Sequence, residues 1–160
     1  MSITGESENY PSKVGPGVGD IFTGLFMSFG IIAAVRDAEK TGIGQLVDLA
    51  MYDAMISLCE RIVYQYDLDG CSPVPGGNTH PLLVPFGIFK AANGFVALGI
   101  VDDSFWKVFV EIMGRSDLSI DPKYSSISAR QRNAKIVNNL VETWTSRHRK
   151  EDLTRLLGGK

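Results

Sequence analysis

The sequence FGIFKAANGFVALGI, residues 86–100, is the stretch that most clearly predicts a fold. Two runs rich in aromatic and β-branched residues, 86–90 and 95–100, flank the four residues Ala91-Ala92-Asn93-Gly94. Runs of this composition favour strands, and an Asn-Gly pair between them is a strong signal for a tight antiparallel turn. We therefore expect a β-hairpin at this point in the chain.

Helices are expected on the C-terminal side of the hairpin. Asp102 and the polar residues after it can cap a helix, which Gly114 then stops. Residues 127–147 carry apolar side chains at helical spacing and predict one long helix, and a short last helix begins near Lys150. Together with the hairpin, these helices predict a small α+β domain over residues 84–160.

The N-terminal side predicts a different organisation. The expected elements are a loop (1–19), a helix (20–36), a short strand (45–50) and a second helix (51–66). This helix–strand–helix order is typical of α/β structure. Residues 73–83 are rich in glycine and proline and predict a linker loop, which separates a first domain over 1–72 from the small domain.

Composition narrows the class of protein. The 160 residues are 44% hydrophobic and 21% charged, which is ordinary for a globular domain and too apolar for a disordered chain. A net charge of −2 gives no general affinity for nucleic acid or anionic membranes. The two cysteines form no CxxC or Cys/His spacing, so we expect no metal site.

The N-terminus predicts no secretion signal, because it lacks a basic start followed by an apolar run. The apolar stretch Ile21–Val35 is bracketed by charges and is too short to span a membrane, so it predicts a buried helix. A cytoplasmic protein is therefore expected. At the other end, Gly158 follows a helical run, and we expect a further element after it.

Asp20 follows the glycine-rich sequence Gly17-Val18-Gly19 and has two interpretations. It can be the N-cap of the following helix, where its carboxylate accepts hydrogen bonds from first-turn N–H groups. It can also be a carboxylate nucleophile, since carboxylates form covalent acyl intermediates. The N–H groups at the helix start, with Ile21 and Phe22 as the candidate donors, would then keep it ionised and stabilise an oxyanion. Both interpretations can hold together.

The linker contains the second candidate group, Gly76, Gly77, Asn78 and His80. A histidine on a glycine-rich loop can serve as an acid, a base or a residue that orients a ligand. The alternative is an exposed histidine without a role. Two histidines and no GxSxG sequence give no basis for a serine triad.

Four segments together resemble the CaiB/BaiF (class III) coenzyme A transferases. They are GDIFTG (19–24), KTGIGQLVD (40–48) followed by MYDA (51–54), GNTHP (77–81) followed by VPF (84–86), and DPKY (121–124) followed by Arg130. Each segment alone is a weak signal, but their order and spacing over nearly the whole chain are specific. The resemblance implies part of a Rossmann-like large domain, followed by a small α+β domain that is incomplete here.

The resemblance also implies a chemistry. Asp20 would be the nucleophile that attacks an acyl-CoA thioester, forms an aspartyl anhydride and passes CoA to a carboxylic acid. Gly76, Gly77, Asn78 and His80 fall where the family has a glycine-rich loop over the intermediate. This chain lacks the run of consecutive glycines of the oxalate enzymes, which argues against oxalate as the acceptor.

Coenzyme A would thus be a substrate, with no covalently bound cofactor. Family members are interlocked homodimers more than twice this length, so the chain is expected to be an internal part of an enzyme and inactive by itself. Two other functions stay open. One is a racemase or isomerase of 2-methylacyl-CoA from the same superfamily, in which the aspartate moves a proton. The other is a binding or assembly module without catalysis.

Overall fold

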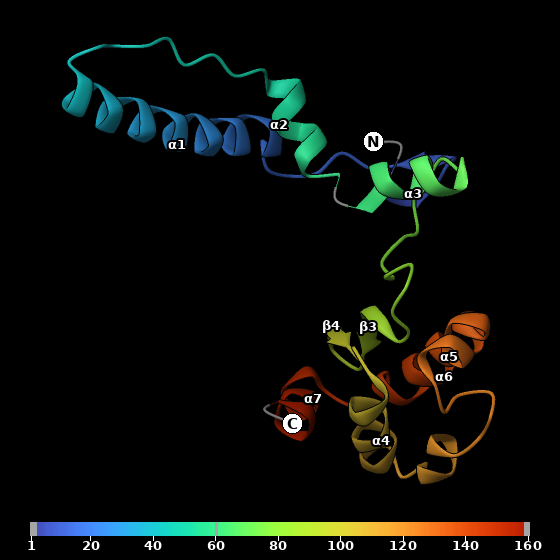
Figure 1. Ribbon diagram of the computed structural model, residues 1–160. Coiled ribbons are helices and arrows are strands. Elements are labelled where there is room, and N and C mark those ends of the chain that lie inside the picture. Colours follow the sequence, from blue (N-terminus) through green and yellow to red (C-terminus); the bar gives the residue numbers. More distant parts are fainter. Residues whose placement is uncertain (1–2, 60, 159–160) are drawn as a thin grey trace. The chain divides into compact units, whose positions relative to one another are not determined.

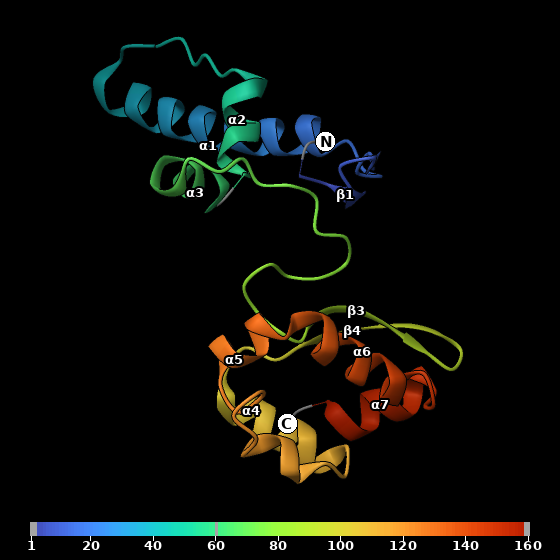
Figure 2. The same ribbon diagram turned by 90° about the vertical axis from the view of Figure 1, so that its right-hand side faces the viewer.

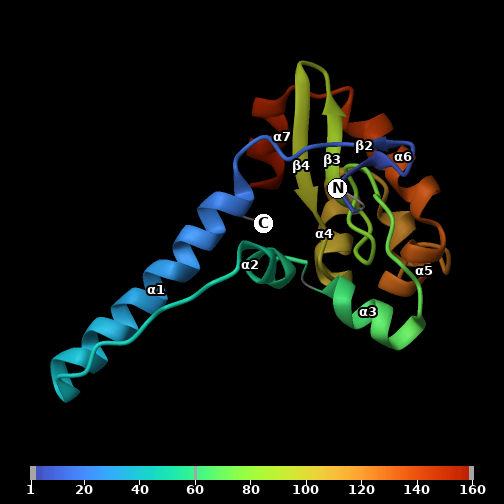
Figure 3. The same ribbon diagram turned by 90° about the horizontal axis from the view of Figure 1, so that it is seen from above.

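The computed structural model describes residues 3–59 and 61–158, which form helices and short strands. Contacts divide the chain into two compact units, Met1–Pro75 and Gly76–Lys160. The division falls between residues 75 and 76, while the expected boundaries at residues 72 and 84 stay predictions. Figures 1 to 3 show the elements of each unit from three directions.

The first unit begins with a small antiparallel ribbon of β1 (Gly5–Ser7) and β2 (Tyr10–Pro11), where the sequence predicted only a loop. Gly5 has a φ of 143°, and a Cβ atom at this position would collide with the Tyr10 carbonyl oxygen. A glycine therefore allows the two strands to approach this closely. The ribbon leads directly into the segment before the first helix.

Helix α1 (Val18–Thr41) is longer than the predicted helix at both ends. The sequence Ala38-Glu39-Lys40 consists of good helix formers and continues the helix beyond Arg36, where the predicted helix ended. Gly42 ends it, with a left-handed φ of 73° and an N–H that donates to the Ala38 carbonyl at 2.8 Å.

No residue of α1 is buried, so the prediction of a buried helix is wrong for this chain. Large apolar side chains along it, such as Phe29 and Ile32, are about two-thirds exposed. With 24 residues, helix α1 is long and apolar enough to cross a membrane, by length and composition only. Core helices of soluble proteins can have the same length and apolar composition, so these two properties do not assign α1 to a membrane.

The predicted strand 45–50 is not formed: these residues are extended but pair with no strand in the described part of the first unit. They run back beside α1 (Figure 1). A Cβ atom on Gly30 would lie 2.9 Å from Val47 Cγ1, so the glycine lets this segment pack closely against the helix. In the described part of the chain, the segment therefore has no neighbouring strand with which to form a sheet.

The single helix predicted over 51–66 is two helices, α2 (Met51–Ser57) and α3 (Arg61–Asp69). The end of α2 tightens, because Leu58 N–H donates to the Met55 carbonyl and Cys59 N–H donates to the Ile56 carbonyl. Hydrogen bonds between residues three positions apart thus replace the bonds between residues four positions apart that would continue an α-helix. Helix α2 packs against α1, and the two helices lie side by side in Figures 1 and 2.

The predicted hairpin is confirmed in the second unit as β3 (Phe86–Ala91) and β4 (Gly94–Gly99), antiparallel and in register from Phe86↔Gly99 to Ala91↔Gly94. The turn itself is Ala92-Asn93, and Gly94 is the first residue of β4, with a φ of 141°. Asn93 Oδ1 accepts a hydrogen bond from the Lys150 N–H at 2.9 Å, which ties the turn to the last helix.

Four α-helices and one 3₁₀-helix follow the hairpin among the described residues: α4 (Asp103–Ile112), η1 (Ser116–Ser119), α5 (Ile127–Arg132), α6 (Ala134–Thr145) and α7 (Lys150–Leu157). The helix expected after Asp102 and the one expected near Lys150 are confirmed. The long helix predicted over 127–147 is wrong, because it is interrupted at Asn133, whose amide donates to the Lys123 and Ala129 carbonyls.

Asp102 caps α4 as predicted. Its carboxylate accepts hydrogen bonds from the N–H groups of Ser104 and Phe105 and from the Ser104 hydroxyl. The Ser104 hydroxyl and then the Phe105 N–H hold the pKa of this carboxyl below its usual value. The cap fixes where α4 starts and therefore which of its faces packs on the hairpin.

The core of the second unit lies between the hairpin and the helices. Its buried apolar side chains come from β3, α4, η1 and α6 and from the segments beside the strands: Val84, Phe89, Ile100, Trp106, Phe109, Val110, Leu118, Val137 and Val141. Thr145 is buried at the end of α6 and donates its hydroxyl to the Lys90 carbonyl at 2.7 Å. This bond joins α6 to β3, which lie side by side in Figure 2.

Arg130 on α5 is fully buried among these elements. Its guanidinium donates to the Val84 carbonyl at 2.9 Å, the Tyr124 carbonyl at 3.0 Å and Asp103 Oδ1 at 2.9 Å. It also lies 5.0 Å from the centre of the Trp106 ring. A single planar cation thus connects the segment before β3 to α4 and α5.

We expect Arg130→Ala to reduce the free energy of unfolding of the second unit by about 3 kcal/mol, because it leaves two carbonyl groups and a carboxylate without their buried partner. Urea unfolding followed by tryptophan fluorescence measures this, since both tryptophans, Trp106 and Trp144, lie in this unit. Arg132→Ala, at an exposed position two residues away, is the control. Equal midpoints for the two variants would contradict the structural role of Arg130.

Candidate active site

Asp20 lies in the first turn of α1, at its third residue, and not at the N-cap. The N-cap is Gly17, which makes no side-chain capping bond, so the N-cap interpretation of Asp20 is wrong. An acidic residue in the first turn still interacts favourably with the positive end of the helix dipole. The carboxylate of Asp20 is exposed, and its oxygens are not used as a helix cap.

Glycines shape the space around this carboxylate. A Cβ atom on Gly17 would lie 2.9 Å from Asp20 Oδ2, which is closer than such atoms approach. A Cβ atom on Gly19 would lie 3.6 Å from Met51 Sδ and 3.7 Å from Met55 Sδ, in contact with α2. The glycine at position 17 therefore leaves room for the carboxylate, whereas a side chain at position 19 would make only ordinary contacts with α2.

Ile21 and Phe22 are not the free donors that the sequence analysis expected. The Ile21 N–H donates to the Gly17 carbonyl at 3.0 Å, and helix geometry gives the Phe22 N–H the Val18 carbonyl. The N–H groups that precede the first helical bond belong to Val18, Gly19 and Asp20, and that of Val18 donates to the Pro16 carbonyl. The helix start therefore offers the N–H groups of Gly19 and Asp20 in place of the predicted pair.

Asp20 lines a surface depression of about 350 Å³. The wall is formed by the segment from the ribbon to α1, with Met55 of α2 on one side: Thr4, Ser12, Lys13, Val14, Pro16, Gly17, Val18, Gly19, Asp20 and Met55. Lys13 also lines the depression, and the sequence did not lead us to predict it as a site residue. One sequence feature could have indicated it, because Lys13 is the only lysine or arginine in the first 35 residues.

The second candidate group, residues 76–80, belongs to the second unit and is anchored by β3. The Ile88 N–H donates to the Asn78 carbonyl at 2.9 Å, and the His80 N–H donates to the Phe86 carbonyl at 2.8 Å. A side chain on Gly87 would collide with the Asn78 carbonyl, so this glycine permits the close pairing. Gly77 has a φ of 65° and turns the chain into the pairing.

The His80 ring is held in one orientation. Its Nδ1 atom accepts hydrogen bonds from the N–H groups of Leu82 and Leu83, both at 3.0 Å, and the ring lies 5.2 Å from that of Phe86. Because Nδ1 accepts, the proton of the neutral ring is on Nε2. His80 therefore presents a donor at Nε2, while its Nδ1 atom is used by the backbone.

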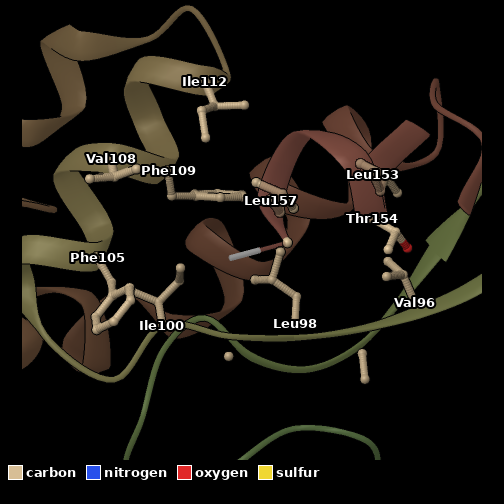
Figure 4. A pocket seen from close by; sticks show the side chains of 13 residues that line it. Val96, Leu98, Ile100, Phe105, Val108, Phe109, Ile112, Leu153, Thr154 and Leu157 are labelled. Atoms are coloured by element: carbon tan, nitrogen blue, oxygen red, sulfur yellow. The ribbon is translucent and has the colours of Figure 1, made fainter. Parts of the chain in front are cut away.

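Another depression in the second unit, of about 330 Å³, has no comparable chemistry. It lies between β4, α4 and α7, and Figure 4 shows apolar side chains such as Leu98, Phe109 and Leu157 around it. No charged residue, histidine or cysteine lines it. In the described residues, 3–59 and 61–158, no group of three or more His, Cys, Asp or Glu side chains could hold a metal ion.

A carboxylate on a glycine-rich segment at the start of a helix, beside open space and free backbone donors, is an arrangement suited to acyl transfer through a covalent intermediate. The family comparison agrees with this class, because the model of CoA-transferase family III matches residues 1–160. The chain belongs to CoA-transferase family III.

Similar proteins extend this result. The chain is 47% identical, over all of its 160 residues, to a succinyl-CoA:mesaconate CoA-transferase from Haloarcula hispanica, of which it covers 40%. It is 33% identical over 153 residues, 96% of the chain, to a succinate–glutarate CoA-transferase from Agrobacterium fabrum, of which it covers 38%. The crystal structure of a CaiB/BaiF family protein from Brucella suis matches 98% of the chain and 42% of that protein, with a TM-score of 0.80 and 30% identity. The chain thus spans about two-fifths of the length of these relatives.

Substitution of His80 tests the hydrogen bonds that hold the loop. We expect His80→Ala to raise amide hydrogen exchange at Leu82 and Leu83 about tenfold, because each N–H loses its acceptor. His80→Asn should keep slow exchange, since the asparagine Oδ1 can take the place of Nδ1. Exchange measured by NMR on the whole chain checks both variants. Equal protection of the two amides in His80→Ala would show that Nδ1 does not hold this turn.

Proposed function

We propose that the protein containing this chain transfers coenzyme A from succinyl-CoA to a dicarboxylic acid, with Asp20 as the nucleophile. The observation that carries the proposal is the position of Asp20, an unblocked carboxylate in the first turn of α1 beside a depression of about 350 Å³. Two relatives named for transfer between succinate or succinyl-CoA and another dicarboxylic acid support the choice of substrates.

The first half of the reaction forms an acyl-enzyme. An Asp20 oxygen attacks the thioester carbonyl, the carbon–sulfur bond breaks, and the products are a mixed anhydride and CoA thiolate. The N–H groups of Gly19 and Asp20 are suited to stabilise the oxyanion that develops. The thiolate then attacks the aspartyl carbonyl of the anhydride, which releases succinate and leaves an aspartyl-CoA thioester.

The second half runs the same steps toward the acceptor. The acceptor carboxylate attacks the aspartyl-CoA thioester, which gives a new anhydride and the thiolate. The thiolate then attacks the acceptor carbonyl, forms the new CoA thioester and restores the Asp20 carboxylate. Protons and redox equivalents are neither gained nor lost, so the cycle requires coenzyme A only as a substrate group.

The family resemblance also implies that the loop of Gly76, Gly77, Asn78 and His80 takes part in binding the intermediate. In this role, His80 is a hydrogen-bond donor through Nε2 and not a general base, because Nδ1 already accepts two backbone hydrogen bonds. Gly77 adds a left-handed turn to the loop, which a residue with a side chain rarely adopts.

The longer protein is proposed to be cytoplasmic and a homodimer. The exposed apolar residues of α1 support a contact with further protein surface, since a free apolar surface of this kind is unusual for a soluble protein. Relatives that are about two and a half times as long offer enough additional chain to provide that contact. The chain by itself is expected to be inactive.

We expect Asp20→Ala in the full-length enzyme to lower transfer from succinyl-CoA to mesaconate by at least about 10⁴-fold, because the nucleophile is gone. The fold should lose only about 0.5 kcal/mol, the worth of an acidic residue in a first helical turn. The measurement combines transfer rates with mass spectrometry after incubation with succinyl-CoA and a hydroxylamine quench. Glu39→Ala, at the opposite end of α1, is the matched control.

A hydroxamate on the wild-type peptide that holds Asp20 and its absence without acyl-CoA would support the covalent mechanism. Activity above a few per cent in Asp20→Ala would contradict it. No hydroxamate, together with deuterium exchange at the α-carbon of a 2-methylacyl-CoA, would support the racemase alternative. Failure of the full-length protein to bind CoA would favour a non-catalytic module.

Gly17→Ala and Gly15→Ala form a pair that tests the space around Asp20. A Cβ atom on Gly17 would press on the Asp20 carboxylate, whereas one on Gly15 would meet no atom within 4 Å. We expect Gly17→Ala to lower kcat/KM about 10- to 100-fold by displacing the nucleophile. Gly15→Ala should stay within about twofold of wild type. Equal rates for the two variants, measured with succinyl-CoA and mesaconate, would contradict the steric role of Gly17.

A further inference from the structure

Lys13 brings a positive charge into the depression that holds Asp20. Its ammonium group donates to the Val14 carbonyl at 3.1 Å and to the Gly15 carbonyl at 3.4 Å, so the side chain folds back over the segment that leads to α1. An ammonium group has three N–H donors, and these two bonds leave one for a ligand. Lys13 and Asp20 line the same depression.

No other cationic side chain lines this depression among the described residues. Lys13 is also the only lysine or arginine in the first 35 residues, where Glu6, Glu8 and Asp20 are acidic. A single cation in this stretch forms no basic surface patch, but its side chain lines the same depression as the proposed nucleophile.

The charge of the depression changes during the reaction proposed above. While Asp20 is ionised, its negative charge and the positive charge of Lys13 offset each other. Once Asp20 is an anhydride or a thioester it is neutral, and Lys13 together with the N-terminus of α1 leaves the depression positive. The depression then favours an anionic group at the stage when the acceptor enters.

A dicarboxylic acid brings such a group. One of its carboxylates reacts, and the other stays ionised through the whole cycle. A carboxylate that leaves water to bind in the depression loses hydration, and a hydrogen-bonded cation offsets this cost. We propose that Lys13 binds the non-reacting carboxylate of the acceptor and so selects dicarboxylic over monocarboxylic acids. This inference rests on the proposed transfer reaction.

The phosphates of coenzyme A are the other anions that a lysine could bind, and the two cases differ in their kinetics. A contact with the acceptor affects only dicarboxylates, whereas a contact with a phosphate affects every CoA substrate equally. In a two-step covalent mechanism, kcat/KM for the acceptor reports the second half-reaction alone. Comparing acceptors of equal size with and without the second carboxylate therefore separates the two cases.

The test compares Lys13→Met with wild type in the full-length enzyme, with succinyl-CoA as the donor. Mesaconate is compared with 2-methylbut-2-enoate, and glutarate is compared with pentanoate. A monocarboxylate that turns over too slowly is measured as a competitive inhibitor against mesaconate. Lys13→Arg keeps the charge, and Lys107→Met, at an exposed lysine of α4, is the matched control.

We expect Lys13→Met to lower kcat/KM for both dicarboxylates about 10- to 100-fold, which is the worth of one hydrogen bond to a charged group. The monocarboxylates should change by less than about twofold, and Lys13→Arg should restore most of the loss. An equal loss for both classes of acceptor, an equal rise in the KM for acyl-CoA donors with and without a second carboxylate, or no change at all would overturn the proposal.

The failure of this inference is distinguishable from failure of the proposed function. Hydroxylamine trapping of Asp20 in wild type tests the nucleophile and does not depend on Lys13. If wild type is trapped and Lys13→Met keeps the dicarboxylate preference, the role of Lys13 is wrong and the transfer reaction stands. If wild type is not trapped, the proposed function fails first.

Discussion

The absence of a side chain at Gly17 is the constraint on which the candidate site depends. A methyl group at position 17 would press on the Asp20 carboxylate, whereas one at position 19 would make only ordinary contacts with the sulfur atoms of Met51 and Met55. Gly17 therefore lets the Asp20 carboxylate lie where it does, in the wall of the depression.

The second unit depends in a similar way on one buried side chain. Arg130 joins the segment before β3 to α4 and α5 through three hydrogen bonds and contact with Trp106. The loop that carries His80 enters β3 through this same segment, so the arginine fixes the base of the loop. A loop that is held at its base by a charged group can present donors such as His80 Nε2 in a defined orientation.

Features set by neighbouring residues were predictable. The hairpin, the Asp102 cap of α4 and the last helix follow from turn residues, capping residues and apolar spacing, which act over a few positions. The wrong predictions have two causes, a missing partner strand and side-chain or turn hydrogen bonds that end a helix early. The segment 45–50 has a strand sequence without a partner strand, and the helices predicted over 51–66 and 127–147 are interrupted where local hydrogen bonds compete with the helix.

The sequence by itself determined the hairpin, the glycine-rich approach to Asp20, and the family resemblance, which the match over residues 1–160 confirms. These depend on residue type and spacing, which are local properties. Only the tertiary structure decided that Gly17 and not Asp20 is the N-cap, that Nδ1 of His80 is occupied, and that Lys13 shares the depression with Asp20. Such facts arise from the path of the backbone, which brings atoms together in space and leaves no periodic trace in the sequence.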